Sequence, residues 1–226
     1  MQYQLTIDID PQGVQNIYNS GQTITIVKSV NSSPLQSGNL PVAWIAFQPL
    51  ETNVVTWEEN YSIYATTTQL QSGATIQMSS TTSGSVQQGW LYTLAGGIFT
   101  GTTGGGATTF NAGNAMSQHP FSFGLAQQTF INNVATTAPL NAIPVLYNES
   151  VSFTPLETIS LFLSSYSNNG VVISQVAGNA LVVTLSSQTP SAAIGFNDAT
   201  NSFFQQSTAK LLDAYDFAKR LSAPAR

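Results

Sequence analysis

The sequence predicts an all-β fold, an antiparallel two-sheet β-sandwich that ends in a C-terminal amphipathic helix. Apolar and polar residues alternate in short runs, Gly, Asn and Pro separate these runs, and extended helical spacing is confined to the C-terminus. Sandwiches reach about 250 residues as one domain, so a chain of 226 residues fits a single domain. We expect residues 1–206 to form the sandwich and residues 207–226 to be a helix and tail of the same domain.

The first residues carry the clearest strand pattern. One side of this run is polar and the other apolar, the apolar side being Tyr3, Leu5, Ile7 and Ile9. Pro11 ends the strand, and the spacing of the next apolar residues predicts one or two helical turns closed by Gly21. A second strand is expected over residues 23–30.

Two further runs predict strands that are rich in aromatic residues. Residues 41–47 are apolar on both faces, as a central strand requires, and Trp44 is expected in the core. In residues 54–64, alternation places Glu59 on the same face as Trp57 and Tyr61. Burial of a carboxylate is costly, so we expect Glu59 to be at least half-buried and hydrogen-bonded, or to lie at a β-bulge that re-aims it.

Residues 65–117 predict strands joined by long polar loops, because Thr, Ser, Gly and Gln dominate them. The glycine-rich residues 101–106 are expected to form a flexible loop. The Ser/Thr-rich residues 65–83 fit either solvent-facing edge strands or amphipathic hairpins that insert into a membrane, as toxins use. The sequence leaves these two alternatives open.

The remaining chain predicts a run of short strands and then a helix. Strands are expected at residues 121–125, 143–147, 159–164, 171–176 and 181–185, with Asn169-Gly170 as a two-residue hairpin turn. From about Ser207 to Leu221, apolar residues repeat at three- and four-residue steps. We expect this helix to dock on the body or to assemble with another copy, because its apolar stripe would otherwise face water.

Charge is scarce and unevenly distributed. Only 7% of residues are charged, against about 25% in a typical domain. Residues 1–209 hold eight of the ten acidic residues and one cation, Lys28, while the other four cations lie in the last 17 residues. A chain with so few cations is not expected to bind nucleic acid, and its neutral polar surface suits sugars or self-association.

The sequence also bears on localisation and on chemistry. The N-terminus has no signal-peptide pattern, and no apolar run approaches the ~18 residues of a membrane helix, so we expect cytoplasmic synthesis without a transmembrane segment and leave release from the cell open. There is no cysteine and a single histidine, His119, directly before Pro120. Glu58 and Glu59 point to opposite faces of a strand, so they do not form a hydrolytic pair. We expect no catalytic residue, no metal site, no cofactor and no enzymatic activity.

Aromatic residues near carboxylates mark the candidate binding residues. Sugar sites place ring faces against CH groups and place carboxylates or amides against hydroxyls. The residues that fit this description are Trp57, Glu59, Tyr61, Tyr64, Trp90 and Tyr92. The alternative is that these rings are simply sandwich core.

Two functions follow from these observations. The first is a non-enzymatic recognition protein, lectin-like or toxin-like, that binds a glycan or a cell surface. The alternative is a structural protein that self-assembles into a filament, crystal inclusion or shell through low-charge surfaces. Both fit a homo-oligomer.

Overall fold

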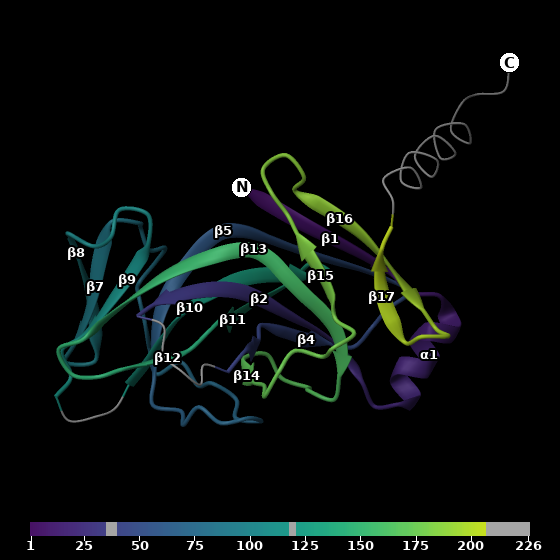
Figure 1. Cartoon of the computed structure of the whole chain (residues 1–226), viewed down its shortest axis with the longest axis horizontal. Helices are drawn as coiled ribbons and strands as arrows, with labels where there is room; N and C mark the ends of the chain where they lie inside the picture. Colours follow the sequence, from purple (N-terminus) through teal and green to yellow (C-terminus); the bar gives the residue numbers. More distant parts are fainter. Residues whose placement is uncertain (35–39, 118–120, 207–226) are drawn as a thin grey trace, which may run out of the picture.

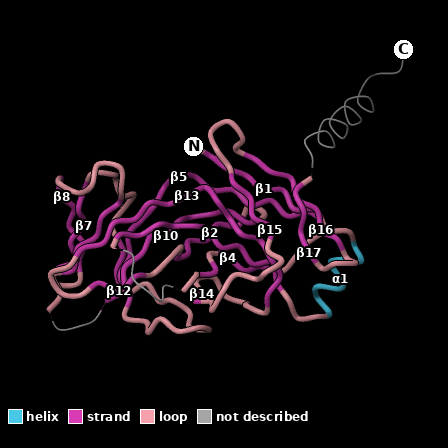
Figure 2. The backbone as a smooth tube through the Cα atoms, viewed as in Figure 1, coloured by secondary structure: helices cyan, strands magenta, loops and turns pink. Residues whose placement is uncertain are grey.

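The computed structural model describes residues 1–34, 40–117 and 121–206. This part of the chain is an all-β, sandwich-like structure in which two large sheets face one another and a small third sheet lies beside them (Figure 1). Among these residues the one helix is α1 (Pro11–Asn19), which is cyan in Figure 2. None of the described helices is long and apolar enough to cross a membrane. The predicted helix of residues 207–221 lies outside the described residues.

The first large sheet has eight strands. Its main path runs β11 (Val134–Pro139), β10 (Phe121–Ile131), β5 (Thr52–Thr66), β1 (Gln2–Asp8), β16 (Ser191–Asn197) and β17 (Ser202–Gln205). Two short strands pair off this path, β12 (Ile143–Val145) on β10 and β6 (Ser80–Thr81) on β5.

The second large sheet has seven strands. Its main path runs β4 (Ile45–Phe47), β2 (Thr23–Ser33), β13 (Ser150–Ser164), β9 (Phe110–Asn114), β7 (Trp90–Ala95) and β8 (Ile98–Thr103), with β15 (Leu181–Thr184) pairing on β13. A two-stranded sheet joins β14 (Val171–Val172) to β3 (Val42–Ala43). One hydrophobic core cluster draws buried residues from both large sheets.

The strand directions correct one prediction. Most pairs are antiparallel, but β1 runs parallel to β16 and β7 runs parallel to β9, so a wholly antiparallel sandwich is wrong. Parallel pairing needs a long connection between the two strands. Nearly the whole chain separates β1 from β16, and β8 intervenes between β7 and β9.

The N-terminal segment folds as its pattern predicts. The apolar face of β1 is buried, and α1 (Pro11–Asn19) begins directly after the strand. The Asp10 carboxylate accepts a hydrogen bond from the Gly13 backbone N–H at 2.7 Å, which caps the first helical turn. Gly21 has a φ of +66°, so the predicted glycine at the end of the helix is confirmed.

Residues 41–47 do not form one central strand. The segment divides into β3 and β4, which belong to different sheets, and Trp44 lies between them with no exposed surface. The core position of Trp44 is confirmed. A run that is apolar on both faces is compatible with a segment that passes through the core between two sheets, so its composition did not reveal the break.

The hairpin predicted at Asn169-Gly170 is wrong. β14 pairs with β3 and not with β13. The Asn169 side chain accepts a hydrogen bond from the Ala46 N–H at 2.8 Å, which ties this loop to β4. The two-residue turn between β10 and β11 lies instead at Asn132 and Asn133, which both have positive φ.

The glycine-rich segment is also more regular than predicted. Residues 101–103 belong to β8, so a loop over the whole of residues 101–106 is wrong. The N–H groups of Gly104 and Gly105 donate to the Gly89 carbonyl oxygen, which holds the following turn against the start of β7. Cross-strand pairing with β7 therefore overrides the low strand propensity of the glycine.

Gly124 in β10 provides a test of the packing between β10 and its surroundings. A Cβ at this position would lie 1.9 Å from the Asn141 carbonyl oxygen, a backbone atom. We expect Gly124→Ala to lower the free energy of unfolding by about 2–3 kcal/mol. The exposed Gly84 has no atom within 4 Å of a Cβ, so we expect Gly84→Ala to stay within about 0.5 kcal/mol of the parent protein in urea unfolding. Equal stability of the two variants would contradict this packing.

Candidate functional site

Two β-bulges face each other across the sandwich. Gln127 of β10 pairs with Tyr61 of β5, and Thr129 pairs with Trp57. More residues separate Trp57 from Tyr61 than separate Gln127 from Thr129, so β5 carries extra residues at this point. β13 has a matching irregularity between Pro155 and Ile159, opposite β2. The extra residues include Glu59 on β5 and Glu157 on β13, and these two carboxylates lie where the regular ladders break.

The position of Glu59 confirms the second of its two predicted alternatives, the β-bulge that re-aims the side chain. The side chain is exposed, so burial of Glu59 is wrong, but the bulge does turn it away from the face that Trp57 and Tyr61 share. The Tyr3 hydroxyl donates a hydrogen bond to Glu59 Oε1. Glu59 is therefore held at the surface end of the cluster.

The bulge on β13 brings Glu157 to Lys28, a lysine with no side-chain surface exposed. Lys28 Nζ lies 2.8 Å from Glu157 Oε1, and the Glu157 side chain is 12% exposed. Trp57 Nε1 donates to Glu157 Oε2 at 2.8 Å, and the Tyr61 hydroxyl donates to Glu157 Oε1 at 3.0 Å. Both oxygens of the carboxylate therefore accept hydrogen bonds from buried donors, as a charge in an apolar environment requires.

Three aromatic rings surround the Lys28 ammonium. Its Nζ lies 5.7, 5.5 and 5.3 Å from the ring centroids of Trp44, Trp57 and Tyr61, within the range of cation–π attraction. Burial lowers the pKa of Lys28 to about 8, against the opposing attraction of Glu157. Burial, with Glu157 nearby, raises the pKa of Tyr61 far above its ordinary value of 10.0.

Gln127 completes the buried polar network. Its side-chain Oε1 accepts from Lys28 Nζ at 2.9 Å, and its Nε2 donates to the Glu58 carbonyl oxygen at 2.6 Å. Trp44 Nε1 donates to the Gln127 backbone carbonyl at 3.4 Å. The network therefore connects β2 and β13 of one sheet to β5 and β10 of the other.

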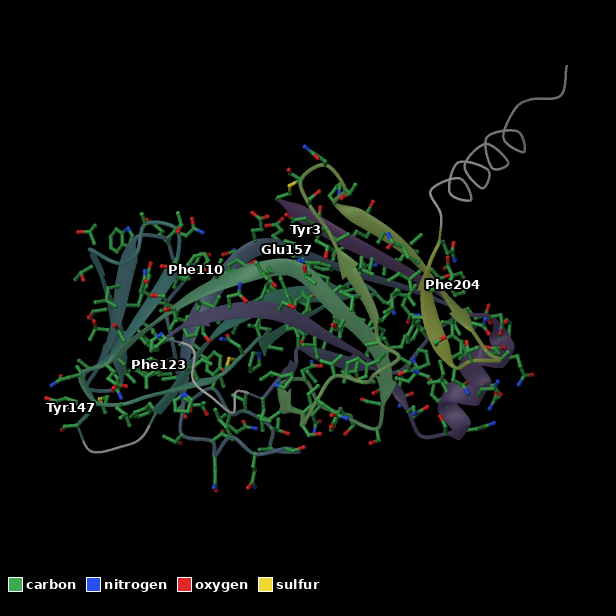
Figure 3. The ribbon with its side chains drawn as sticks, viewed as in Figure 1. Tyr3, Phe110, Phe123, Tyr147, Glu157 and Phe204 are labelled. Atoms are coloured by element: carbon green, nitrogen blue, oxygen red, sulfur yellow. The ribbon has the colours of Figure 1, made fainter. Side chains whose placement is uncertain are left out.

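A cavity of about 360 Å³ opens beside this network. Its lining combines two carboxylates, one amide, two aromatic rings and two residues of β13: Glu59, Glu157, Gln88, Tyr61, Phe110, Thr154 and Pro155. The Tyr61 and Phe110 rings are in contact, with centroids 5.3 Å apart. Figure 3 shows Glu157 on β13, the central strand of its sheet, and Phe110 on β9. The cavity therefore has an aromatic wall and hydrogen-bonding groups from separate strands.

Trp90 and Tyr92 form a second aromatic pair near this cavity. Their rings stack with centroids 6.4 Å apart, and both side chains are half-buried. A Cβ on Gly101 would lie within 3.2 Å of both rings, so the rings lie flat on β8 at this glycine. The Gln87 N–H donates to the Tyr92 hydroxyl at 2.9 Å, which places this pair next to Gln88 of the cavity lining.

The six candidate residues divide into three groups. Glu59 and Tyr61 line the cavity, and Trp90 and Tyr92 lie beside it. Trp57 and Tyr64 are core residues with 1% and 0% of their surface exposed. Tyr64 donates its hydroxyl hydrogen bond to the Asn141 carbonyl oxygen at 2.6 Å and has no place in the cavity lining.

Sequence reasoning missed Lys28, Gln127 and Glu157, which organise the cluster. A signal for Lys28 was present, because it is the one cation of residues 1–209 and lies within an apolar strand. Nothing in the local sequence marks Gln127 or Glu157, since their partners lie 99 and 129 residues from them along the chain.

The phenol of Tyr64 allows a pH-dependent test of its own burial in the core. Burial raises the pKa of Tyr64, so the folded protein keeps this proton above pH 10 while the unfolded chain loses it. The contribution is complete below pH 10 and is lost as the pH rises above it, by about 1.4 kcal/mol at pH 11. We expect urea unfolding of Tyr64→Phe to show a correspondingly smaller fall in stability between pH 9 and 11. An identical fall in both proteins would contradict burial of this phenol.

Comparisons with protein-family models, with curated proteins and with solved structures found no match to this chain. Among the described residues, no group of three or more His, Cys, Asp or Glu side chains could hold a metal ion. Function is therefore inferred from the residues of the cavity itself.

Proposed function

We propose that the protein is a non-enzymatic recognition protein, lectin-like in its chemistry, that binds a neutral polar ligand such as a glycan. One observation carries the proposal. The cavity beside the bulges combines the Tyr61–Phe110 aromatic wall with fixed carboxylates and the Gln88 amide. Rings pack against the CH patches of a sugar, and carboxylates and amides accept or donate hydrogen bonds to its hydroxyls.

The size and the rigidity of the cavity support a small ligand. Its volume of about 360 Å³ lies near the lower end of small-molecule sites, which suits one sugar ring at the end of a longer chain. Glu157 and Tyr61 are held by the buried network before any ligand arrives. Preorganised groups lose little conformational entropy on binding, which favours affinity.

Three other cavities of the described residues lack this combination. The cavity beside β2 and residues 140–143 has neither an aromatic ring nor a carboxylate in its lining, and nor has the one beside residues 75–78. The cavity at α1 has the Asp198 carboxylate but no aromatic ring. Of these four cavities, the one lined by Glu59 and Glu157 therefore fits a sugar best.

The state of Glu157 supports binding over catalysis. A glycoside hydrolase needs a carboxylic acid that donates a proton and a second carboxylate that acts as nucleophile or base. Both oxygens of Glu157 instead accept hydrogen bonds, from Lys28, Tyr61 and Trp57. A side chain that is held in this way is placed to orient a ligand hydroxyl.

A glycan array followed by calorimetric titration of the best sugar tests the proposal. We expect Glu59→Ala and Gln88→Ala each to weaken binding about tenfold, since each removes a hydrogen-bonding group from the cavity. Gln87→Ala is the matched control, because Gln87 is exposed and absent from the lining. The absence of any sugar ligand, or equal affinity in all three variants, would overturn it.

Self-assembly is the second candidate, favoured by apolar side chains on the sheet edges. Val134 on β11 and Ile98 on β8 are 70% and 69% exposed, and each of these strands lies at an edge of its sheet. Phe204 on the edge strand β17 is 44% exposed. Unpaired edges with apolar residues pair readily with another copy.

Sedimentation velocity separates the two candidates. If assembly is the function, the protein sediments as a large homo-oligomer, and Val134→Lys or Ile98→Lys returns it to a monomer because a charge on the edge opposes pairing. Gln12→Lys, at an exposed position of α1 away from both edges, is the control for added charge. A monomer at all concentrations would eliminate the structural alternative.

A further inference from the structure

An amine and a carboxamide meet between the two large sheets. Lys28 lies on β2 of the seven-stranded sheet, and Gln127 lies on β10 of the eight-stranded sheet. Lys28 Nζ is 2.9 Å from Gln127 Oε1, and the carbonyl carbon of the amide is one bond beyond that oxygen. Both residues are 1% exposed, so water is excluded from the pair.

We propose that Lys28 and Gln127 form an intramolecular isopeptide bond that joins the two sheets covalently. The lone pair of Lys28 Nζ attacks Gln127 Cδ, the new Nζ–Cδ bond forms, and the Cδ–Nε2 bond breaks. The Gln127 side-chain nitrogen leaves as ammonia. No oxidant, reductant or other reactant is needed.

Proximity and the lowered pKa of the amine both favour this step. Fixed reactants replace a bimolecular encounter by an intramolecular one, which raises the effective concentration by many orders of magnitude. An amine attacks only in its neutral form, and burial lowers the pKa of Lys28 to about 8, so neutral amine is present near neutral pH. Gln127 Nε2 donates to the Glu58 carbonyl oxygen at 2.6 Å, which fixes the orientation of the amide.

Glu157 and Tyr61 supply the route for the protons. Glu157 accepts one proton from the Lys28 ammonium, with which it is in contact at 2.8 Å. As the bond forms, the amine gives up a second proton, which the leaving nitrogen needs. The Tyr61 hydroxyl donates to Glu157 at 3.0 Å and accepts from Lys28 Nζ at 3.3 Å, so it connects the carboxyl to the amine whose second proton must reach the leaving nitrogen. The products are a neutral amide, a protonated Glu157 and ammonia.

The balance of charge favours the products. Before the step, an ammonium and a carboxylate are buried together, and removing both from water is costly. After the step, no charge remains in this part of the core. The ammonia has an exit, because Glu157 lines the cavity that opens beside the network.

The mass of the purified full-length chain tests the bond directly. We expect the 24.0 kDa chain to be lighter by about 17 Da, the mass of one ammonia molecule. After denaturation and digestion, a fragment containing Lys28 should remain covalently attached to a fragment containing Gln127. Trypsin should also fail to cleave after Lys28, because an acylated lysine is not its substrate. This mapping distinguishes the bond from ammonia loss at an Asn or at the N-terminus.

Variants assign the roles within the cluster. Gln127→Ala removes the acceptor and should restore the full mass expected for its sequence. Glu157→Gln should slow or abolish the mass loss while leaving both reacting groups in place. The exposed neighbour Gln128 provides the matched control, and Gln128→Ala should keep the mass loss and the linked fragments.

Several outcomes would overturn the proposal. A parent chain of full mass after prolonged incubation at pH 9 would show that the amine and the amide do not react. A loss of about 18 Da with Lys28 linked to Glu157 would show that water leaves instead and that Gln127 is not the acceptor. A mass loss that persists in Gln127→Ala would place the modification elsewhere.

Discussion

The ion pair between Lys28 and Glu157 is the interaction on which the centre of the sandwich depends. Two charges removed from water cost several kcal/mol unless hydrogen bonds satisfy them, so each atom of the pair needs a partner. Trp57, Tyr61 and Gln127 supply these partners from the opposite sheet. The irregularity in β13 lies between Pro155 and Ile159, the strand partner of Lys28, and places Glu157 beside that lysine. The irregularity in β5 lies between Trp57 and Tyr61, the two residues that donate to Glu157.

The same irregularities position the proposed binding cavity. A regular β5 would place Glu59 on the buried face, and the bulge instead holds it at the cavity rim, bound by Tyr3. Glu157 belongs both to the buried network and to the cavity, because it pairs with Lys28 and also lines the cavity. Ligand recognition and cohesion of the two sheets are thus coupled through one carboxylate. The Lys28–Gln127 bond that we propose would replace the ion pair by a covalent link between the two sheets, in a chain that has no cysteine.

Prediction from the sequence succeeded where one face of a segment is buried and the other solvated. The β1 alternation and the glycine that closes α1 are local patterns, and the structure confirms both. The hairpin at Asn169-Gly170 failed because Asn169 bonds to β4, a contact between segments 123 residues apart. Of the candidate site residues, Glu59 and Tyr61 line the cavity. Tyr64 is likewise an aromatic residue near carboxylates in the sequence, but it packs in a different core cluster.

The sequence by itself determined the all-β class, the positions of most strands and the scarcity of surface cations, because periodicity and composition are properties of the chain alone. The tertiary structure decided which strands pair, where β5 and β13 depart from regular pairing, and which aromatic residues border a cavity. Above all, it brought Lys28 to Glu157 and Gln127. Such contacts follow from sheet packing, where the cost of a buried charge selects partners that are distant in sequence, and no local pattern records that selection.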